Sequence, residues 1–168
     1  AQKITDEACV CKCGCSTDSG LAKLPQVRAA QEFEALRLAT EKAAKRPKAF
    51  MLTIGSLAMR LARAQFSCNF LACAGYEVVD NLGFDTVEAG VAAAQKAGAD
   101  IIVLCSSDDE YAEFAPAAFK AINGKQIFIV AGAPACMEDL KAQGIENFIN
   151  VRSNVLETLK SFNAQLLK

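Results

Sequence analysis

Four cysteines near the start of the chain are the residues best suited to chemistry. Cys9, Cys11, Cys13 and Cys15 alternate with other residues, so four thiols fall within seven positions. Four thiolates can surround one soft cation, which makes zinc or an iron–sulfur cluster one hypothesis for this segment. The alternate spacing differs from the usual ligand patterns, and no second ligand pair follows. A flexible segment whose thiols are reduced, or joined in adventitious disulfides, is the competing interpretation.

Histidine is absent from all 168 residues. This absence excludes catalytic triads with an imidazole base, histidine-containing zinc sites and any axial imidazole ligand to a cofactor metal. A catalyst made from this sequence would depend on Asp, Glu, Lys, Arg, Cys, Ser or Tyr. No acid–base pair or activated nucleophile can be identified among these residues. We therefore expect no catalytic residue in this chain.

A second group of candidate residues shares one property, since each lies at the end of a short apolar run or just after it. The group consists of Gly55, Ser56, Ser106, Ser107, Ala131 and Gly132. A Gly–Ser pair that opens a helix can accept an anion through backbone N–H groups. The small-residue loop 131–134 could let a flat ligand lie against the backbone. Glycine also serves in ordinary turns, so both interpretations stay open, and neither GxGxxG nor GxxxxGK[ST] is present.

Charged residues flank the same positions. The acids of the run 106–110 would suit a metal or general acid–base chemistry. They would equally suit the start of a helix, where the helix dipole favours negative charge. Arg60 and Arg63 lie about one helical turn apart and could bind a phosphate or a partner's carboxylate, although solvated arginines are common on helices.

The elements that must position these residues are predicted by alternating apolar runs and helical patterns. We expect strands at 49–54, 76–80, 101–105, 126–131 and 148–151. We expect helices at 26–45, 56–74, 85–97, 107–122, 136–143 and 154–167. Continuously apolar strands are typical of a parallel sheet covered on both faces. With right-handed crossovers, a flavodoxin-like, doubly wound α/β sheet of five strands in the order 2-1-3-4-5 is favoured.

Helix starts carry their own signals. Ser56 is a good N-cap for its helix, and Asp85 with Glu88 has the spacing of a capping box. Ser107 and Glu110 repeat that spacing at the next helix. In the expected strand order, the carboxyl ends of the first and third strands meet where ligands bind in such sheets. The six candidates would therefore line one crevice.

The chain divides into three expected parts. Residues 1–25 form a Cys-rich flexible arm, 26–47 an amphipathic lead-in helix, and 48–168 the α/β domain. The chain begins with Ala1 and not with Met, so we expect it to be a segment of a longer protein.

Charge and hydropathy exclude two kinds of partner. The 18 basic and 19 acidic residues give a net charge of −1, which offers no electrostatic footprint for nucleic acid. No apolar run approaches the roughly 20 residues that span a membrane. Cysteines at core-like positions, among them Cys105, favour a reducing compartment, so we expect a cytoplasmic protein.

Much of the sequence resembles a known family. The segments 48–60, 73–78, 104–111, 130–136 and 145–149 resemble the C-terminal domain of the small subunit of bacterial methylmalonyl-CoA mutase. The preceding Phe33–Arg37 resembles the segment that leads into that domain. The resemblance covers about 140 residues, and the cysteine quartet lies outside it.

The resemblance implies a fold similar to the cobalamin-binding domain of B12-dependent mutases. In cobalamin binders, a D-x-H-x-x-G motif after the first strand supplies the histidine that ligates cobalt. An S-x-L motif and a Gly-Gly pair after the third and fourth strands hold the nucleotide tail. Here the corresponding segments are 55–60, 105–107 and 131–132, and the histidine position falls near Met59 or Arg60.

The resemblance therefore implies a non-catalytic domain of a heterodimeric, adenosylcobalamin-dependent isomerase that interconverts succinyl-CoA and methylmalonyl-CoA. Adenosylcobalamin would lie in the large subunit, which is the expected partner, and this domain would no longer ligate cobalamin through histidine. Two alternatives stay open. The crevice could retain base-on cobalamin or another small molecule, or the segment Cys9–Cys15 could have a metal or redox role.

Overall fold

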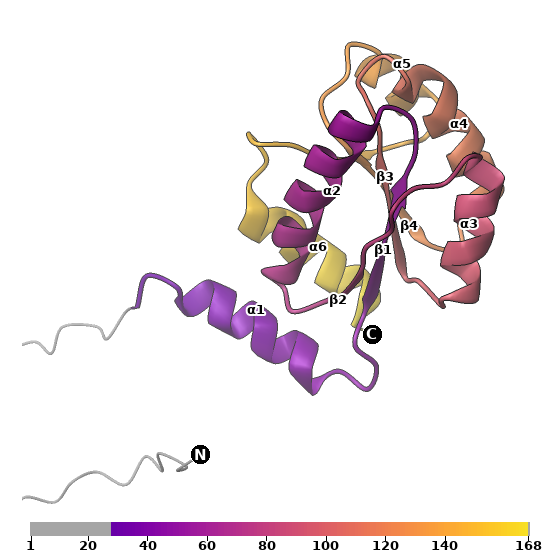
Figure 1. Cartoon of the computed structure of the whole chain (residues 1–168). Coiled ribbons are helices and arrows are strands. Elements are labelled where there is room, and N and C mark those ends of the chain that lie inside the picture. The colour runs from indigo at the N-terminus through magenta and orange to yellow at the C-terminus, as the bar shows by residue number, and fades with distance from the viewer. Residues whose placement is uncertain (1–27, 168) are drawn as a thin grey trace, which may run out of the picture.

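A five-stranded parallel sheet forms the centre of the protein, as a computed structural model describes it for residues 28–167 (Figure 1). The strands are β1 (Lys48–Thr53), β2 (Glu77–Val79), β3 (Ile101–Cys105), β4 (Ile127–Ala131) and β5 (Asn147–Ile149). Their order across the sheet is β2-β1-β3-β4-β5, and every neighbouring pair is parallel. The predicted flavodoxin-like order is confirmed.

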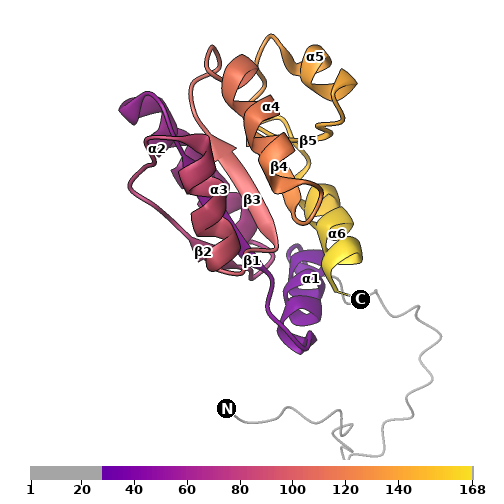
Figure 2. The ribbon, with the colours of Figure 1, turned by 90° about the vertical axis from the view of Figure 1, so that its right-hand side faces the viewer.

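Helices cover both faces of the sheet. They are α1 (Gln31–Lys42), α2 (Leu57–Ala72), α3 (Val87–Lys96), α4 (Tyr111–Ile122), α5 (Met137–Ala142) and α6 (Val155–Leu166). Helices α1, α2 and α6 pack on one face, and α3, α4 and α5 pack on the other (Figures 1 and 2). This three-layer arrangement buries a core on each side of the sheet.

Alternation along β3 divides the core between the two layers. Ile102 and Leu104 point to the layer of α3 and α4, whereas Ile101 and Val103 point to the layer of α2 and α6. All four side chains are fully buried. Burial of an aliphatic side chain of this size contributes about 1.5–3 kcal/mol. The central strands are thus continuously apolar because they have no solvent-facing side.

The two edge strands are shorter than the sequence predicts. β2 covers Glu77–Val79 within the expected 76–80, and β5 covers Asn147–Ile149 where 148–151 is expected. Each pairs on one side only. Beyond β5 the backbone N–H of Asn150 donates to the Ser153 hydroxyl at 3.0 Å, and this turn ends the ladder.

Two of the predicted helix starts are wrong in detail. Thr86, not Asp85, caps α3, because its backbone is extended and its hydroxyl accepts from Ala89 N at 3.2 Å. Helix α4 begins at Tyr111, four residues after Ser107, since the intervening residues form a turn. Asn154 caps α6, because its side chain accepts from Glu157 N at 3.2 Å.

Helix α1 is shorter than expected and packs against α6. It ends at Lys42, ahead of the extended connection to β1, in which Lys45 donates to Asp100 at 2.7 Å. A buried polar contact fixes α1, because the Asn163 amide of α6 donates to the Thr40 hydroxyl at 3.3 Å. The hydroxyl of Tyr76 donates to the same Asn163 at 2.6 Å.

Some of the expected features fall outside the described residues. These are the arm 1–25, its cysteines Cys9, Cys11, Cys13 and Cys15, and the first two residues of the expected lead-in helix. Within residues 28–167, no helix combines the length and the apolar character that crossing a bilayer requires.

Candidate functional site

The six strand-end candidates lie at one edge of the sheet. Strands β1 and β3 are neighbours and β4 pairs with β3, so the loops after these strands adjoin. The ladder continues into the first loop, where Ile54 N donates to Cys105 O at 3.1 Å. It also continues into the third, where Gly132 N donates to Ile149 O at 2.9 Å. The structure therefore brings Gly55, Ser56, Ser106, Ser107, Ala131 and Gly132 to a common edge.

The carboxylate of Glu110 fills the space between the first two loops. Its Oε2 atom accepts from the Ser106 hydroxyl at 2.6 Å and from the Ser107 hydroxyl at 2.7 Å. The same oxygen accepts from Ser107 N at 3.2 Å and from Ser56 N at 3.3 Å. Gly55 leaves the necessary room, because a Cβ there would lie 2.2 Å from Oε2. The backbone of Gly55 has φ +79°, a conformation that favours glycine.

These hydrogen bonds set the charge of Glu110. Donation from the Ser106 hydroxyl, followed by that from Ser107, lowers the pKa of Glu110 from 4.5 to about 2. Partial desolvation opposes this shift but is the smaller effect. Hydrogen bonds to an ionised carboxylate favour the charged form. The crevice thus contains a fixed negative charge from the chain itself.

Tyr111 ties the second loop to the third. Its side chain is fully buried, and its hydroxyl accepts from Ser106 N at 3.1 Å and donates to Ala131 O at 2.5 Å. Burial raises the pKa of the phenol above its ordinary value, so the hydroxyl stays protonated and can donate. Tyr111 is a structural link between the ends of β3 and β4.

The two arginines of α2 bind groups of their own chain. Arg60 donates to Gly55 O at 3.2 Å, and its guanidinium would lie 2.6 Å from a Cβ placed on Gly83. Arg63 pairs with Asp108 through contacts of 2.9 and 3.1 Å. Its guanidinium carbon would lie 3.3 Å from a Cβ on Gly132. Both arginines thus contact groups of this chain, and binding of a phosphate or of a partner's carboxylate stays a prediction.

Three of the four cysteines in the described region are buried or half-buried, and Cys73 is exposed. Cys105 is fully buried, and burial raises the pKa of its thiol to about 12. Burial likewise raises the pKa of Cys68 to about 11. Both thiols are therefore protonated and weakly nucleophilic at neutral pH. Within residues 28–167, no group of three or more His, Cys, Asp or Glu side chains is placed to hold a metal.

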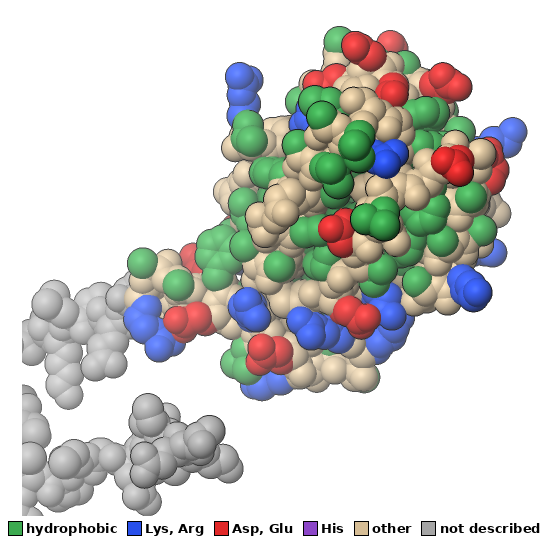
Figure 3. Space-filling view, in the orientation of Figure 1, with side chains coloured by type: hydrophobic (Ala, Val, Ile, Leu, Met, Phe, Trp, Pro, Cys, Tyr) green, Lys and Arg blue, Asp and Glu red, His purple; other side chains and the backbone are tan. Residues whose placement is uncertain are grey.

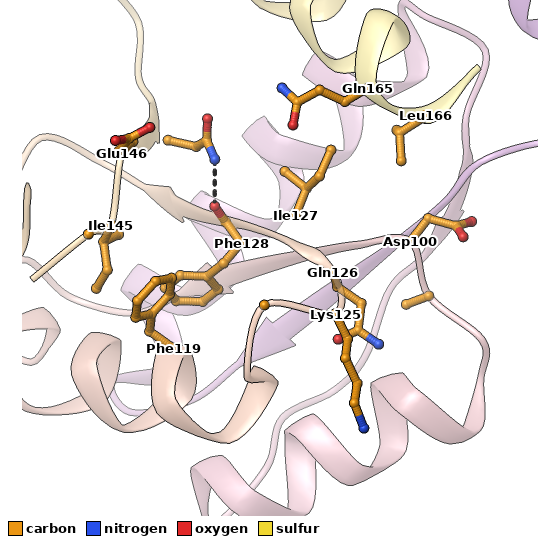
Figure 4. A pocket seen from close by; sticks show the side chains of 14 residues that line it. Asp100, Phe119, Lys125, Gln126, Ile127, Phe128, Ile145, Glu146, Gln165 and Leu166 are labelled. Carbon is orange, nitrogen blue, oxygen red and sulfur yellow. Dashed lines mark hydrogen bonds between the residues drawn. The ribbon is translucent and has the colours of Figure 1, made fainter. Parts of the chain in front are cut away.

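Two hollows lie near the edges of the sheet. One of about 600 Å³ adjoins the Arg63–Asp108 pair and extends beyond β4 to the segment 150–153. The other, of about 570 Å³, lies at the opposite edge among Asp100, Lys125, Gln126 and further residues (Figure 4). The second hollow is far from the candidate residues, because it opens at the amino ends of β3 and β4.

Large apolar side chains are exposed beside the crevice. Leu57 and Leu61 of α2 are 60% and 47% exposed, and Leu82 in the loop after β2 is 91% exposed. Figure 3 shows hydrophobic side chains gathered over α2. Exposed apolar surface of this kind is typical of contact regions.

Sequence reasoning missed the roles of Glu110 and Tyr111. The spacing of Ser107 and Glu110 did signal a contact between these two residues, and their contact is confirmed. The reach of Glu110 to Ser56 had no sequence signal, because the two residues are 54 positions apart.

Comparison with known proteins identifies relatives of this chain. No family model matches it. A methylmalonyl-CoA mutase small subunit from Porphyromonas gingivalis is 64% identical over 149 residues, 89% of this chain and 24% of that protein. One from Streptomyces virginiae is 36% identical over 104 residues, 60% of this chain and 17% of that protein. A crystal structure of a cobalamin-binding protein from Desulfitobacterium hafniense has TM-score 0.45 and 23% identity, covering 79% of this chain and 66% of that one.

The chain thus spans about a quarter or less of the length of these relatives. The P. gingivalis protein aligns with nearly the whole of it at high identity. Over 149 residues, therefore, this chain belongs to the methylmalonyl-CoA mutase small-subunit family.

Proposed function

We propose that this chain is a non-catalytic domain of the small subunit of a heterodimeric, adenosylcobalamin-dependent methylmalonyl-CoA mutase. The observation that carries the proposal is the lack of any histidine in a chain 64% identical to such a small subunit. Ligation of cobalt by imidazole is then impossible within this chain. The isomerisation of succinyl-CoA and methylmalonyl-CoA would take place in the large subunit, which would hold the adenosylcobalamin.

The side chains at the crevice do not fit cobalamin bound through an imidazole. The position near which that ligand is expected carries Met59 and Arg60, and Arg60 is engaged with Gly55 O. Glu110 fills the turn after β1, and the Arg63–Asp108 pair lies beside Gly132. These contacts support a domain that has no part in the radical chemistry.

A supporting role requires contact with the large subunit. The exposed leucines beside the crevice favour this role, because apolar side chains on a surface lose their contact with water when a partner covers them. Two groups of the crevice region favour it too, since the Cys105 thiol is buried and the Oε2 atom of Glu110 accepts four hydrogen bonds. The domain would act through packing and not through a reacting group.

Association is the first test of this proposal. The domain, with the upstream part of the small subunit restored, is mixed at micromolar concentration with a methylmalonyl-CoA mutase large subunit and the mixture is fractionated by size. We expect one co-eluting complex of equal stoichiometry. Separate elution of the two proteins would remove the proposal.

Cobalamin titration is the second test. Absorption spectra of the chain with increasing hydroxocobalamin should equal the sum of the separate spectra, while a cobalamin-binding protein measured alongside gives a saturable change. Stoichiometric binding by this chain would overturn the proposal and favour a module that retains base-on cobalamin.

The cysteine quartet is a separate prediction. If Cys9, Cys11, Cys13 and Cys15 hold zinc or an iron–sulfur cluster, protein prepared without oxygen should contain bound zinc or iron. Elemental analysis of such protein decides it, and absence of zinc and iron would end the hypothesis.

A further inference from the structure

Four hydrogen-bond donors from two loops converge on a single carboxylate oxygen. Three come from the loop after β3, namely the hydroxyls of Ser106 and Ser107 and the backbone N–H of Ser107. The fourth is Ser56 N, which belongs to the loop after β1. The oxygen that accepts all four is Oε2 of Glu110. This contact therefore spans the point where the order of strands in the sheet reverses.

The contact goes beyond the capping of one helix. A capping residue serves the free N–H groups of its own helix, whereas Ser56 N lies at the start of α2 and Glu110 lies just ahead of α4. The Ser56 side chain makes no capping bond of its own. Gly55 provides the room for the carboxylate, since its missing Cβ would overlap Oε2, Oε1 and Cδ.

The backbone at this place favours a negatively charged group. In a parallel α/β sheet, helices begin at the carboxyl edge, so free N–H groups and positive dipole ends collect there. In many proteins an anionic ligand binds to these N–H groups. Here an anionic side chain supplies the same charge and accepts the same hydrogen bonds.

We propose that Glu110 is an intramolecular plug, a contact that occupies the hydrogen-bond donors of the crevice and excludes external oxyanions. The plug goes beyond the proposed function, because it concerns small oxyanions such as acetate and phosphate and needs neither cobalamin nor the large subunit. It predicts that shortening Glu110 exposes the four donors to a small external anion.

The experiment compares three variants of the full chain with wild type. Glu110→Ala removes the plug, Glu110→Gln keeps its volume without its charge, and Asp109→Ala removes a neighbouring exposed acid as a matched control. Thermal unfolding is followed at pH 7 in sodium chloride and in sodium acetate of equal ionic strength. Inorganic phosphate serves as a second probe.

We expect Glu110→Ala to unfold at a lower temperature than wild type in chloride and to regain about 2–4 °C in acetate, the shift expected for an anion at several times its dissociation constant. Wild type, Glu110→Gln and Asp109→Ala should show no difference between the two salts, because their donors are covered. If the unfolding temperature of Glu110→Ala rises in phosphate but not in acetate, the result would support a plug against larger anions.

Two results would overturn the plug. One is a Glu110→Ala protein whose unfolding temperature is the same in all three salts. The other is an equal rise in every variant, which would mean a general salt effect. If Glu110→Ala is recovered folded only from acetate or phosphate buffer, the plug is supported. If it is recovered from none while Glu110→Gln folds, the plug is overturned, since a small anion should replace it. Failure of this test leaves the association and cobalamin tests unaffected.

Discussion

The two edges of the sheet differ in how they satisfy their polar groups. At the carboxyl edge, Glu110, Tyr111 and Arg60 all make hydrogen bonds to the backbone of strand-end loops. At the amino edge there is a hollow of about 570 Å³ with Lys125 and Gln126 at its border (Figure 4). Between the loops after β1 and β3 the chain's own side chains fill the carboxyl edge, although a hollow of about 600 Å³ lies further along that edge toward β5.

The direction of the helices explains this difference. Helices α2 and α4 begin at the carboxyl edge, so their unpaired N–H groups need acceptors there. A side chain can supply the acceptor where no ligand does, and this matters most for donors that water cannot reach, because a buried donor left unpaired costs about 1–3 kcal/mol. At the amino edge the same helices end with free carbonyl groups, and the free N–H of Lys48 at the start of β1 donates to Asp100 at 2.9 Å. The position of Glu110 therefore agrees with the direction of the helices.

The largest effect is expected for a matched pair of glycines, one at each edge of the sheet. Gly55 and Gly98 both have positive φ, +79° and +67°, but a Cβ on Gly98 would meet nothing within 4 Å. Strain alone should make Gly98→Ala less stable by about 1–2 kcal/mol. Gly55→Ala should lose about 1–3 kcal/mol more, because it also displaces Glu110. Urea unfolding at pH 7 measures both losses, and equal losses would contradict a stabilising role of Glu110 at the carboxyl edge.

Removal of single hydroxyls tests the same contrast at buried tyrosines. Tyr111→Phe leaves the buried backbone N–H of Ser106 without its acceptor, so we expect a loss of about 1–3 kcal/mol. Tyr76→Phe removes a bond to the Asn163 side chain on the α1 side, and a side chain can readjust. Its loss should be smaller, about 1 kcal/mol. Chemical denaturation measures the free energy of unfolding of both variants. A larger loss for Tyr76→Phe than for Tyr111→Phe would weaken the comparison between the two edges.

Acid should act on the carboxyl edge through Glu110. The folded protein holds the pKa of Glu110 at about 2, below its ordinary 4.5, so this stabilisation is complete above about pH 4.5. It is lost as the pH falls toward 2. Between pH 6 and pH 3 wild type should lose about 1 kcal/mol more than Glu110→Gln, after allowance for solvent screening. Parallel acid profiles of the two proteins would refute this, and Glu113→Gln on the same helix is the control.

The smallest effect is expected at the amino edge. Lys125 is exposed at the border of the amino-edge hollow. Lys125→Ala should change the free energy of unfolding by no more than about 0.5 kcal/mol, as is usual for surface substitutions. A loss above about 1 kcal/mol in urea would mean that this edge also depends on its charged side chains.

Much of the fold was predictable because its signal is local. The run Ile101–Cys105 is a strand in prediction and in structure, since five consecutive apolar residues suit a strand buried on both faces. Positions that depend on distant residues were predicted less well. The ends of β2 and β5 depend on where a neighbouring strand stops pairing, and the start of α4 depends on the turn that brings Glu110 toward Ser56.

The candidate site divides in the same way. The sequence by itself determined that no histidine is available, that six small or polar residues follow buried strands, and that Ser107 and Glu110 are close enough to interact. Only the tertiary structure decided that Glu110 also reaches Ser56 and lies against Gly55. The reason is that this contact exists only when β1 and β3 lie side by side, and their adjacency results from the packing of helices on both faces of the whole sheet.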